Sequence, residues 1–360
     1  MVIPTTTRPR GTYQEAGVDI DRASEAVAKI AGRAKQTFGL SGGPGIGHFG
    51  GVYRLAGSDR CLVASADGVG TKLKLAFVLG GDAHAGVGRD LVHHCVNDVM
   101  ALGARPLFFL DYIAMGRLEP DVVEGVVSGM ISACGELGMV LLGGETAEMP
   151  GLYSDGEYDA AGFIVGEVDV AAVIDGSSIE VGDVLVGLRG TGLHTNGYSL
   201  VRRILGLTGS AVTDRPILDA RLPNGNGASL GEALMQPHQA YWRQLAPLLE
   251  TGWIHGMAHI TGGGIIDNVP RMLPDGMGAV IEQERWNPGP LFTYLLEQGN
   301  IALDEAYRVF NMGIGFVLAV SAGAAGGILQ ALPDALVIGH VTALDSAVGE
   351  WDRIAWRPNL

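Results

Sequence analysis

The chain has 360 residues with 47% hydrophobic side chains, which exceeds one ordinary core and predicts two domains. Its formal net charge of −15 disfavours nonspecific binding to nucleic acids or anionic membranes, because their phosphates would be repelled. No apolar run approaches the length of a membrane span. Three widely spaced cysteines without a C-x-x-C pair predict buried thiols in a reducing cytoplasm.

The first predicted element is a helix over residues 19–34, which leads into Lys35. Residues 39–51 are too rich in glycine for regular structure, so they predict a loop. That loop is either a plain linker or a segment that closes over a ligand. In the second case, Lys35 could be carried onto a phosphate as the segment closes.

An apolar strand predicted over residues 61–66 opens into the glycine turn DGVGTK at residues 67–72. This turn places one carboxylate, one hydroxyl and one ammonium together, the groups that hold a metal-bound polyphosphate. It has neither the Walker A order nor the G-x-G-x-x-G order. Because its acidic residue Asp67 comes first, the turn predicts magnesium and nucleotide binding.

A helical pattern over residues 87–102 has one apolar face and leaves Asn97 and Asp98 off that face. His93 and His94 are adjacent, so they point in different directions and are predicted to be structural rather than a metal pair. A strand, a helix and a second strand follow at residues 106–113, 121–137 and 139–142, and the last ends in a turn at 143–148 that contains Glu145.

A strand at residues 158–168 ends the first predicted domain, so the chain divides into residues 1–174 and 175–360. The second domain begins with a strand at 184–189, a glycine turn at 190–198 and a helix at 199–205. The other predicted elements of this domain are a loop at 212–228, a helix at 241–249, a glycine turn at 259–268, and strands at 316–320 and 335–338.

Asp67, Asp98 and Glu145 lie at turns or on polar faces, and carboxylates that converge from separate segments can bridge magnesium and phosphates. Each of them alone is better explained as a helix cap or a solvated residue, except Asp67, whose neighbours in the glycine turn favour a binding role. His194 and His259 sit in glycine turns, where a histidine can bind phosphate or transfer a proton, although a loop histidine is often a surface residue.

Eight sequence blocks together resemble the AIR synthetase (PurM) family, the phosphoribosylformylglycinamidine cyclo-ligases. They occur in the order expected of that family and span nearly the whole chain. The blocks are AGVDID at 16–21, DGVGTK at 67–72, CVND at 95–98, PLFFLDY at 106–112, GGETAEMP at 143–150, HTNGYS at 194–199, HITGGG at 259–264 and NMGIG at 311–315.

The resemblance implies a fold of two α/β domains. In it, a mixed N-terminal α/β domain joins its sheet to that of a second subunit, forming a barrel in a homodimer, and a layered C-terminal α/β domain packs alongside. It also implies the reaction, the ATP-dependent cyclisation of formylglycinamidine ribonucleotide to 5-aminoimidazole ribonucleotide. An amide oxygen is a poor leaving group, and its phosphorylation by ATP makes ring closure feasible.

The resemblance also assigns roles to residues, by match to the family's motifs. Asp67, Asp98 and Glu145 would hold Mg²⁺, and Lys35, Asp98 and His194 would be catalytic. The ATP-binding residues would be Asp67, Gly68, Gly70, Thr71, Lys72, Asn97, Gly143, Gly144, Glu145 and Thr146. The substrate-binding residues would be His194, Thr195, Asn196, His259, Thr261, Gly262, Gly263 and Gly264.

Two other functions remain open on the sequence alone. The first is another ATP-dependent enzyme of the same superfamily, with thiamine-monophosphate kinase the strongest alternative. Selenophosphate synthetase and the hydrogenase maturation dehydratase are disfavoured, because the N-terminal glycine segment and the C-terminus both lack the cysteine that those enzymes require. The second is a catalytically silent binding protein on the same scaffold, which would be free to lose its carboxylates.

Overall fold

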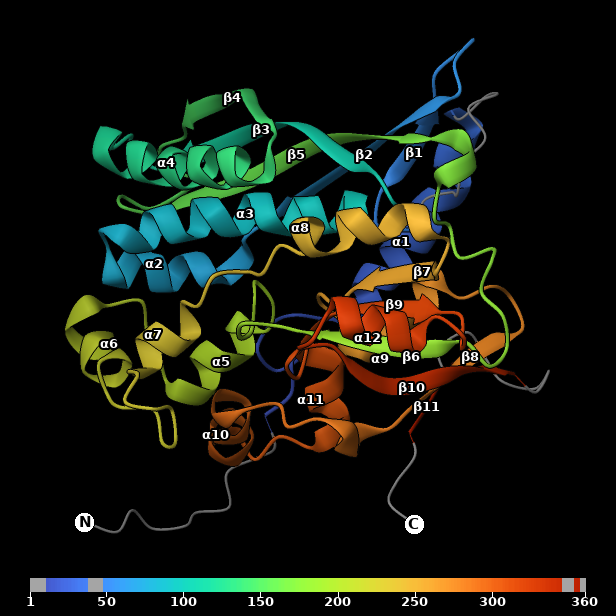
Figure 1. The fold of residues 1–360 in the computed structure, drawn as a ribbon. Helices are drawn as coiled ribbons and strands as arrows, with labels where there is room; N and C mark the ends of the chain where they lie inside the picture. The colour runs from blue at the N-terminus through green and yellow to red at the C-terminus, as the bar shows by residue number, and fades with distance from the viewer. Residues whose placement is uncertain (1–10, 38–47, 345–352, 357–360) are drawn as a thin grey trace.

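Two β-sheets divide the chain into an N-terminal and a C-terminal domain in the computed structural model, which describes residues 11–37, 48–344 and 353–356 (Figure 1). In the described part, the N-terminal sheet has the strand order β1-β2-β5-β3-β4 and the C-terminal sheet has the order β11-β8-β10-β6-β9-β7. The strands of the first sheet are β1 Gly51–Arg54, β2 Arg60–Gly68, β3 Arg105–Met115, β4 Val140–Glu148 and β5 Tyr158–Asp169. Those of the second are β6 Val184–Arg189, β7 Ile254–His259, β8 Met277–Ile281, β9 Ile314–Val320, β10 Leu336–Ala343 and β11 Ile354–Trp356.

The two-domain α/β fold class predicted from the sequence is confirmed. The boundary predicted at residues 174 and 175 lies between β5, the last strand of the first sheet, and β6, the first strand of the second. The barrel expected from two joined sheets would need a second subunit, since the N-terminal sheet of one chain is open, with β1 and β4 at its edges.

Helices α3 and α4 cover one face of the N-terminal sheet (Figure 1). That face contributes Val63, Phe109 and Ile164 to a core that includes Leu91 of α3 and Val126 of α4. The opposite face exposes the large apolar side chains Tyr53, Val140, Leu142 and Phe163. The helices of this domain are α1 Ile20–Ala34, η1 Lys35–Thr37, η2 Gly70–Lys72, α2 Leu73–Leu79, α3 Asp82–Met100, α4 Pro120–Leu137 and η3 Val170–Ala172.

Glycines allow α3 and α4 to pack closely. A β-carbon at Gly129 of α4 would lie 1.9 Å from the carbonyl oxygen of Ala85 in α3. We therefore expect Gly129→Ala to lower the free energy of unfolding by about 1–3 kcal/mol, because the helices must separate. Gly135→Ala in the same helix is the matched control, since a β-carbon there meets nothing within 4 Å. Urea unfolding of the two variants measures the difference, and equal stability would contradict the close packing.

The C-terminal sheet is flanked by shorter helices, and two predicted elements differ here. The loop predicted at 212–228 begins instead as helix α6 Ala211–Leu218, whose start is fixed where Asp214 accepts the amides of Thr208 and Gly209. The helix predicted at 241–249 is split into α8 Trp242–Leu245 and η4 Ala246–Thr251, which has proline at its N-terminus. The others are α5 Tyr198–Leu205, α7 Leu230–Leu234, α9 Gly264–Asn268, η5 Val269–Met272, η6 Gln283–Arg285, α10 Pro290–Gly299, α11 Leu303–Val309 and α12 Ala325–Ala331.

Helix α3 lies between the N-terminal sheet and the C-terminal domain (Figure 1). Every residue from 91 to 100 is buried, including the polar ones. The helix predicted at 87–102 is thus confirmed, but the face predicted to be polar does not meet solvent. The C-terminal domain covers it, and the buried polar groups must find partners there.

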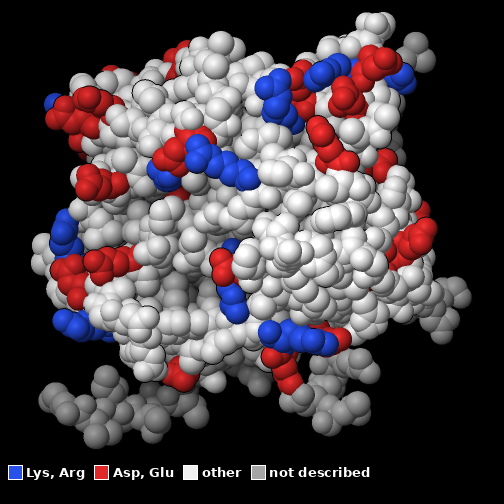
Figure 2. Space-filling view, viewed as in Figure 1, with Lys and Arg blue, Asp and Glu red and all other residues white. Residues whose placement is uncertain are grey.

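On the face shown in Figure 2, charged side chains form small groups in which both signs occur, with broad neutral areas between them. This face carries no continuous basic patch. Within the residues that the structure describes, no helix is long and apolar enough to cross a membrane.

Candidate active site at the domain junction

Five buried histidines meet where α3 faces the C-terminal domain. His93 and His94 belong to α3, and His259 ends β7. His194 lies in the turn after β6, and His238 lies in the irregular segment between α7 and α8. The rings of His194 and His238 stack with centroids 4.2 Å apart, and the rings of His94 and His259 are 5.0 Å apart. Of these five, only His194 and His259 are predicted from the sequence to bind phosphate or transfer a proton.

Two carboxylates lie against this cluster. Asp67, at the end of β2, has Oδ2 2.7 Å from Nε2 of His94. Asp98, on α3, accepts a hydrogen bond from Nδ1 of His259 at 2.9 Å, and its other oxygen accepts one from the hydroxyl of Ser65 at 3.0 Å. The Asp67 side chain is 43% exposed and that of Asp98 only 8%, so Asp67 is the one that reaches solvent. The structure therefore brings these two predicted site residues together.

His94 was predicted to be structural, but it also contacts a predicted site residue. His94 joins the two domains, because its Nε2 contacts Asp67 and its Nδ1 is 2.7 Å from the hydroxyl of Thr195. Burial alone would lower its pKa, but the adjacent Asp67 carboxylate raises the pKa of His94 to about 9. Although burial opposes it, His94 in turn lowers the pKa of Asp67 to about 2. His93 fits the structural interpretation, since its Nδ1 is bonded to the main-chain carbonyl of His238.

These pKa shifts predict a pH dependence of stability. Between its ordinary pKa of 6.5 and about 9, His94 holds a proton in the folded state that it loses in the unfolded state. Its contribution to stability is therefore complete below pH 6.5 and is lost as the pH rises towards 9. The Asp67 contribution is complete above 3.8 and is lost as the pH falls towards 2.

We expect the free energy of unfolding, measured by urea denaturation, to fall more steeply between pH 6.5 and 9 in the parent protein than in His94→Gln. His84→Gln is the control, because burial lowers the pKa of His84 and its Nδ1 lies 2.9 Å from the neutral hydroxyl of Tyr158. The control should keep the full decline. Parallel pH profiles for the parent and His94→Gln would contradict the assignment.

His194 is placed differently from its predicted role. It is 1% exposed and lies between Gly190 and Gly315, so in this conformation it cannot contact a substrate directly. Burial and the nearby charges of His259 and Lys72 hold its pKa well below the usual range, which keeps the ring neutral. Its backbone has φ of 58°, a strained conformation for a residue other than glycine.

Lys72 also departs from its predicted role as a phosphate ligand. Its side chain is fully buried, and its ammonium lies 2.6 Å from the carboxylate of Asp90 on α3. The same ammonium donates a hydrogen bond to the main-chain oxygen of Gln236 in the C-terminal domain at 2.9 Å. The hydroxyl of Thr71 likewise lies 2.9 Å from that of Ser199 on α5. The glycine turn at 67–72 therefore helps to join the domains, and Asp67 is the part of it that faces outwards.

Asn97 has its amide fully engaged by the C-terminal domain. Its Nδ2 donates to the main-chain oxygen of Gln239 at 2.8 Å, and its Oδ1 accepts from the amide of Tyr241 at 3.1 Å. The structure thus does not leave Asn97 free for a nucleotide. Gly68 is the last residue of β2 and follows the exposed Asp67. Gly70, two residues later, has a φ of 66°, which glycine adopts without strain.

The glycine turn at residues 261–264 lies beside Asn196, whose side-chain oxygen would be 3.4 Å from a β-carbon at Gly262. Asn268 holds the turn by donating to the main-chain oxygens of Gly262 and Gly264. Packing explains one of its glycines, since a β-carbon at Gly264 would lie 1.9 Å from the main-chain oxygen of Tyr307. The predicted substrate residues Thr195, Asn196, Thr261, Gly262, Gly263 and Gly264 therefore fall within one region. His259 lies beside them but is fully buried, so in this conformation it cannot contact a substrate directly either.

Arg271 was not singled out by the sequence, yet its charge lies near both carboxylates. Its guanidinium stacks on the ring of Phe49 with 3.8 Å to the ring centre, and it donates to the main-chain oxygen of His48 at 2.7 Å. Burial lowers its pKa, while Asp98 and Asp67 attract its positive charge. An isolated arginine in a chain offers no local pattern that could have identified it.

Four predicted ATP residues are not brought to this cluster within one chain. Gly143, Gly144, Glu145 and Thr146 belong to β4, which continues as a strand to Glu148 instead of ending in the predicted turn. The register runs from Gly68 on β2 through Ala161 on β5 and Tyr112 on β3 to Glu145. Three strand spacings of about 4.8 Å put Glu145 roughly 14 Å from Gly68, at the far edge of the sheet.

Lys35 is the first residue of η1. Of the glycine-rich loop predicted at 39–51, residues 38–47 lie outside the described residues. The remainder, from His48, enters β1 beside Arg271.

A divalent cation needs several ligand atoms that lie close together. Ligand atoms of His94, Asp98 and His259 lie within 4.8 Å of one another. Magnesium prefers carboxylate oxygens, and histidines that hydrogen-bond to carboxylates commonly orient metal ligands. Asp67 and Asp98, each held by one histidine, therefore fit such a site, whereas Glu145 does not reach it within a single chain.

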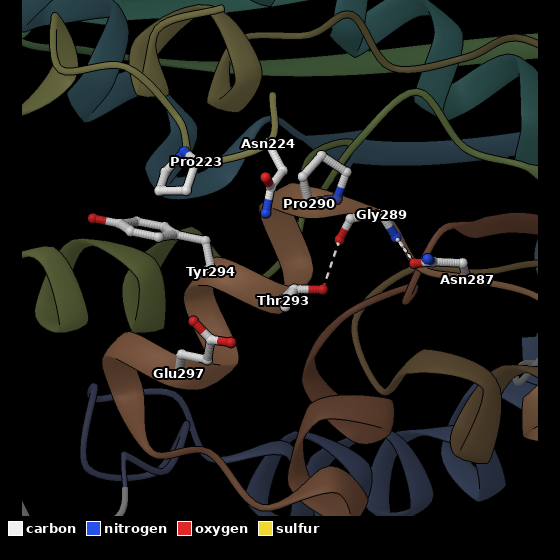
Figure 3. Close-up of a pocket in the computed structure, with 8 residues that line it drawn as sticks. All are labelled: Pro223, Asn224, Asn287, Gly289, Pro290, Thr293, Tyr294 and Glu297. Atoms are coloured by element: carbon white, nitrogen blue, oxygen red, sulfur yellow. Dashed lines mark hydrogen bonds between the residues drawn. The ribbon is translucent and has the colours of Figure 1, made fainter. Parts of the chain in front are cut away.

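Two cavities lie beside α10, at the C-terminal domain surface, and Figure 3 shows the residues that line one of them. One has a volume of about 340 Å³ and the other about 240 Å³, and they share Asn224, Gly289 and Pro290. The smaller one reaches the turn at residues 190–192 that precedes His194. Neither is lined by Asp67, Asp98 or the buried histidines, so neither belongs to the cluster.

The chain matches a known protein family over most of its length. Residues 47–168 match the family described as AIR synthase related protein, N-terminal domain, and residues 180–352 match AIR synthase related protein, C-terminal domain. A relative named phosphoribosylformylglycinamidine cyclo-ligase, from Trichlorobacter lovleyi, is 47% identical over 94% of this chain and 97% of its own length.

Solved structures with the same fold are more distant in sequence. One, described as AaThiL complexed with AMPPCP and TMP, has a TM-score of 0.62 at 15% identity, covering 91% of both chains. A thiamine-monophosphate kinase from Stenotrophomonas maltophilia has a TM-score of 0.59, also at 15% identity, over 90% of this chain and 93% of its own. These structures support the fold alone, while the identity to the cyclo-ligase extends over almost the full length. The chain belongs to the phosphoribosylformylglycinamidine cyclo-ligase family.

Proposed function

We propose that this protein closes the imidazole ring of 5-aminoimidazole ribonucleotide, using ATP and formylglycinamidine ribonucleotide. The observation that carries the proposal is the 47% identity to a cyclo-ligase over almost all of both chains. The alternative, a thiamine-monophosphate kinase, is supported only by a shared fold at 15% identity. The proposal makes the enzyme a ligase of purine biosynthesis.

The reaction has two steps. The formyl amide oxygen of the substrate attacks the γ-phosphorus of ATP, and ADP leaves. The amidine nitrogen then attacks the activated carbon, phosphate leaves with the former amide oxygen, and the attacking nitrogen loses a proton. Because both reacting groups belong to one molecule, holding them together supplies much of the acceleration. A solved protein of the same fold was found with AMPPCP, an analogue of ATP, which supports a nucleotide site in this fold.

In this proposal, Asp67 and Asp98 hold Mg²⁺, whose charge would neutralise the phosphates of ATP. His94 and His259 orient the two carboxylates through their hydrogen bonds. Arg271 adds positive charge beside them. Asn196, Thr195 and the turn at 261–264 form the part of the site that binds the substrate. His194 packs behind these residues, in the interior of the protein, and does not touch the substrate.

The remaining residues predicted to bind ATP have other places in this proposal. Lys35 is retained as a group that contacts ATP phosphate when its segment closes. Gly143, Gly144, Glu145 and Thr146 would contribute only where an assembly brings β4 near the carboxylates. Lys72 and Asn97 are given structural tasks, because their polar groups already bond to the C-terminal domain.

The decisive experiment incubates the purified protein with ATP, Mg²⁺ and formylglycinamidine ribonucleotide, and measures both ADP and the aminoimidazole product. Equal amounts of the two are expected. ADP without aminoimidazole would refute the cyclo-ligase proposal and retain nucleotide hydrolysis. Thiamine monophosphate in place of the ribonucleotide tests the kinase, and we expect it to yield no ADP.

We also propose a homodimer in which the exposed face of the N-terminal sheet is covered by a second copy. Tyr53, Val140, Leu142 and Phe163 support this, because they are large apolar side chains exposed on one face of the sheet, and exposed apolar surface favours association. Phe163→Glu is expected to convert the protein to a monomer, since it would bury a charge. Val212→Glu is the control, because Val212 is 86% exposed on α6 in the other domain. Light scattering coupled to gel filtration distinguishes them, and a dimeric Phe163→Glu protein would contradict the interface.

We place the enzyme in the cytoplasm as part of the same proposal. Its three cysteines, Cys61, Cys95 and Cys134, are all free and buried. Thiols of this kind are typical of a reducing compartment.

A further inference from the structure

One segment of the C-terminal domain lies directly on α3. We call residues 236–241, between α7 and α8, the strap; it has no regular secondary structure (Figure 1). Its main chain is nevertheless bonded at four of its six residues, 236, 238, 239 and 241, by side chains of the N-terminal domain. Lys72 donates to the oxygen of Gln236, Asp90 accepts the amide of His238 at 2.7 Å, and His93 bonds to the oxygen of His238 at 2.6 Å.

The polar residues of α3 form two rows at helical spacing. Asp90, His93 and Asn97 form the first row and bind the main chain of the strap. His94 and Asp98 form the second row and bind groups of the candidate active site. Side chains three and four positions apart share a face of a helix, so the two rows lie next to each other. The strap is therefore held in fixed register with the active-site residues.

Because the strap is held in this register, the imidazole of His238 lies among the buried histidines. Gln236 is exposed, but His238, two residues later, is completely buried. The Nε2 of His238 is 3.1 Å from Nε2 of His259, and its Nδ1 is 3.3 Å from the hydroxyl of Thr195. The side-chain Nδ2 of Asn97 also lies 3.1 Å from Nε2 of His238, but both groups are donors when His238 donates to His259, so this contact is not a hydrogen bond. No sequence motif singled out His238, and the proposed reaction assigns it no task.

Asp98, His259 and His238 form a line of three groups. His259 contacts Asp98 through Nδ1 and His238 through Nε2. Rotation of a histidine ring about its Cβ–Cγ bond is soft, so a ring held at one nitrogen alone can still swing. Held at both nitrogens, the His259 ring cannot turn without breaking a hydrogen bond. The direction of its bond to the Asp98 carboxylate then depends on His238.

We propose that His238 is a positioning residue, which acts through His259 to fix the Asp98 carboxylate for the reaction. The proposal rests on the proposed function for what Asp98 does, but the positioning itself is a property of the folded protein. The partners of metal-orienting groups typically change activity by about 10- to 100-fold when removed. A purely structural role would change stability without a selective loss of turnover.

Steady-state kinetics of His238→Phe, His238→Gln and His84→Phe test the proposal. For His238→Phe we expect kcat to fall about 10- to 100-fold while the KM for each substrate changes less than about threefold. His238→Gln keeps a hydrogen-bonding group near Nε2 and should recover most of the loss. His84→Phe makes the same substitution at another buried, hydrogen-bonded histidine, outside the cluster, and should keep the parent kcat. A His238→Phe protein with kcat within about twofold of the parent would overturn the proposal.

A second readout is independent of activity. With ¹⁵N-labelled histidine, the ring nitrogens of His259 can be assigned by comparison with His259→Gln. We expect these resonances to move in His238→Phe and to stay near the parent values in His84→Phe. Unchanged His259 resonances in His238→Phe would overturn the positioning even if the protein makes no aminoimidazole. A parent protein without that activity would refute the proposed function alone. If His238→Phe does not fold, His238→Asn carries both measurements with the same expected results, because its shorter side chain cannot reach Nε2 of His259.

Discussion

Replacing Asp67 by asparagine is expected to lower kcat by about 10²- to 10³-fold while the protein stays folded. The substitution removes the negative charge that a magnesium ion or its phosphates would need. It keeps an oxygen that can accept from Nε2 of His94, so the contact between the two residues survives. The side chain is 43% exposed, which limits the cost of the change to stability.

Asp159→Asn is a closely matched control for this prediction. Asp159 is exposed on β5 of the same sheet, and its Oδ1 accepts the amide of the next residue, Ala160, as Asp67 does with Gly68. Turnover at saturating Mg²⁺ and thermal unfolding are measured for both variants. The control should behave as the parent in both. Turnover within about threefold of the parent in Asp67→Asn would remove Asp67 from the active site.

Lys72→Met should be the most destabilising of the proposed substitutions, by about 3–5 kcal/mol. The change leaves the carboxylate of Asp90 buried without its cation, since Lys72 and Asp90 are at most 1% exposed. It also removes the hydrogen bond from Lys72 to Gln236. Urea denaturation measures the loss of stability, and the double variant Lys72→Met/Asp90→Leu should recover part of it because no charge remains unpaired.

Lys74→Met provides the control, two residues further along the chain. Lys74 pairs with Glu157, but both side chains are about a third exposed, so water screens the pair. We expect that change to cost less than about 1 kcal/mol. Equal effects at Lys72 and Lys74 would mean that Lys72 is solvated in solution, as a phosphate ligand would be. The comparison therefore separates the structural role of Lys72 from the role expected by resemblance.

Periodicity and motifs predicted most of the elements that build the site. The structure contains the helix predicted at 19–34 and the strands predicted at 61–66 and 158–168, because the spacing of apolar residues alone defines these elements. The two carboxylates Asp67 and Asp98 were also identified, one by its glycine turn and the other by its place in a family motif. Their convergence, by contrast, depends on how the two domains pack.

The errors share a physical cause. Lys72 and Asn97 were interpreted as if polar residues of a helix or turn face solvent or ligand, whereas here they face a second domain. A one-dimensional pattern cannot show which polar face another domain covers. His238 was overlooked for the same reason, since an imidazole between a proline and a glutamine shows no periodicity. Glu145 was grouped with Asp67 because both follow strands, but the strand order separates them.

The strap also limits how this chain can change in length. One residue inserted or deleted between α7 and His238 would leave both hydrophobic cores intact, yet it would shift the imidazole by one position along α3. Surface connections usually tolerate such changes. Here Gln236 and Pro237 are exposed, but they set the distance from α7 to a buried side chain. We therefore expect the number of residues in this connection to matter as much as the identity of the groups that it holds in place.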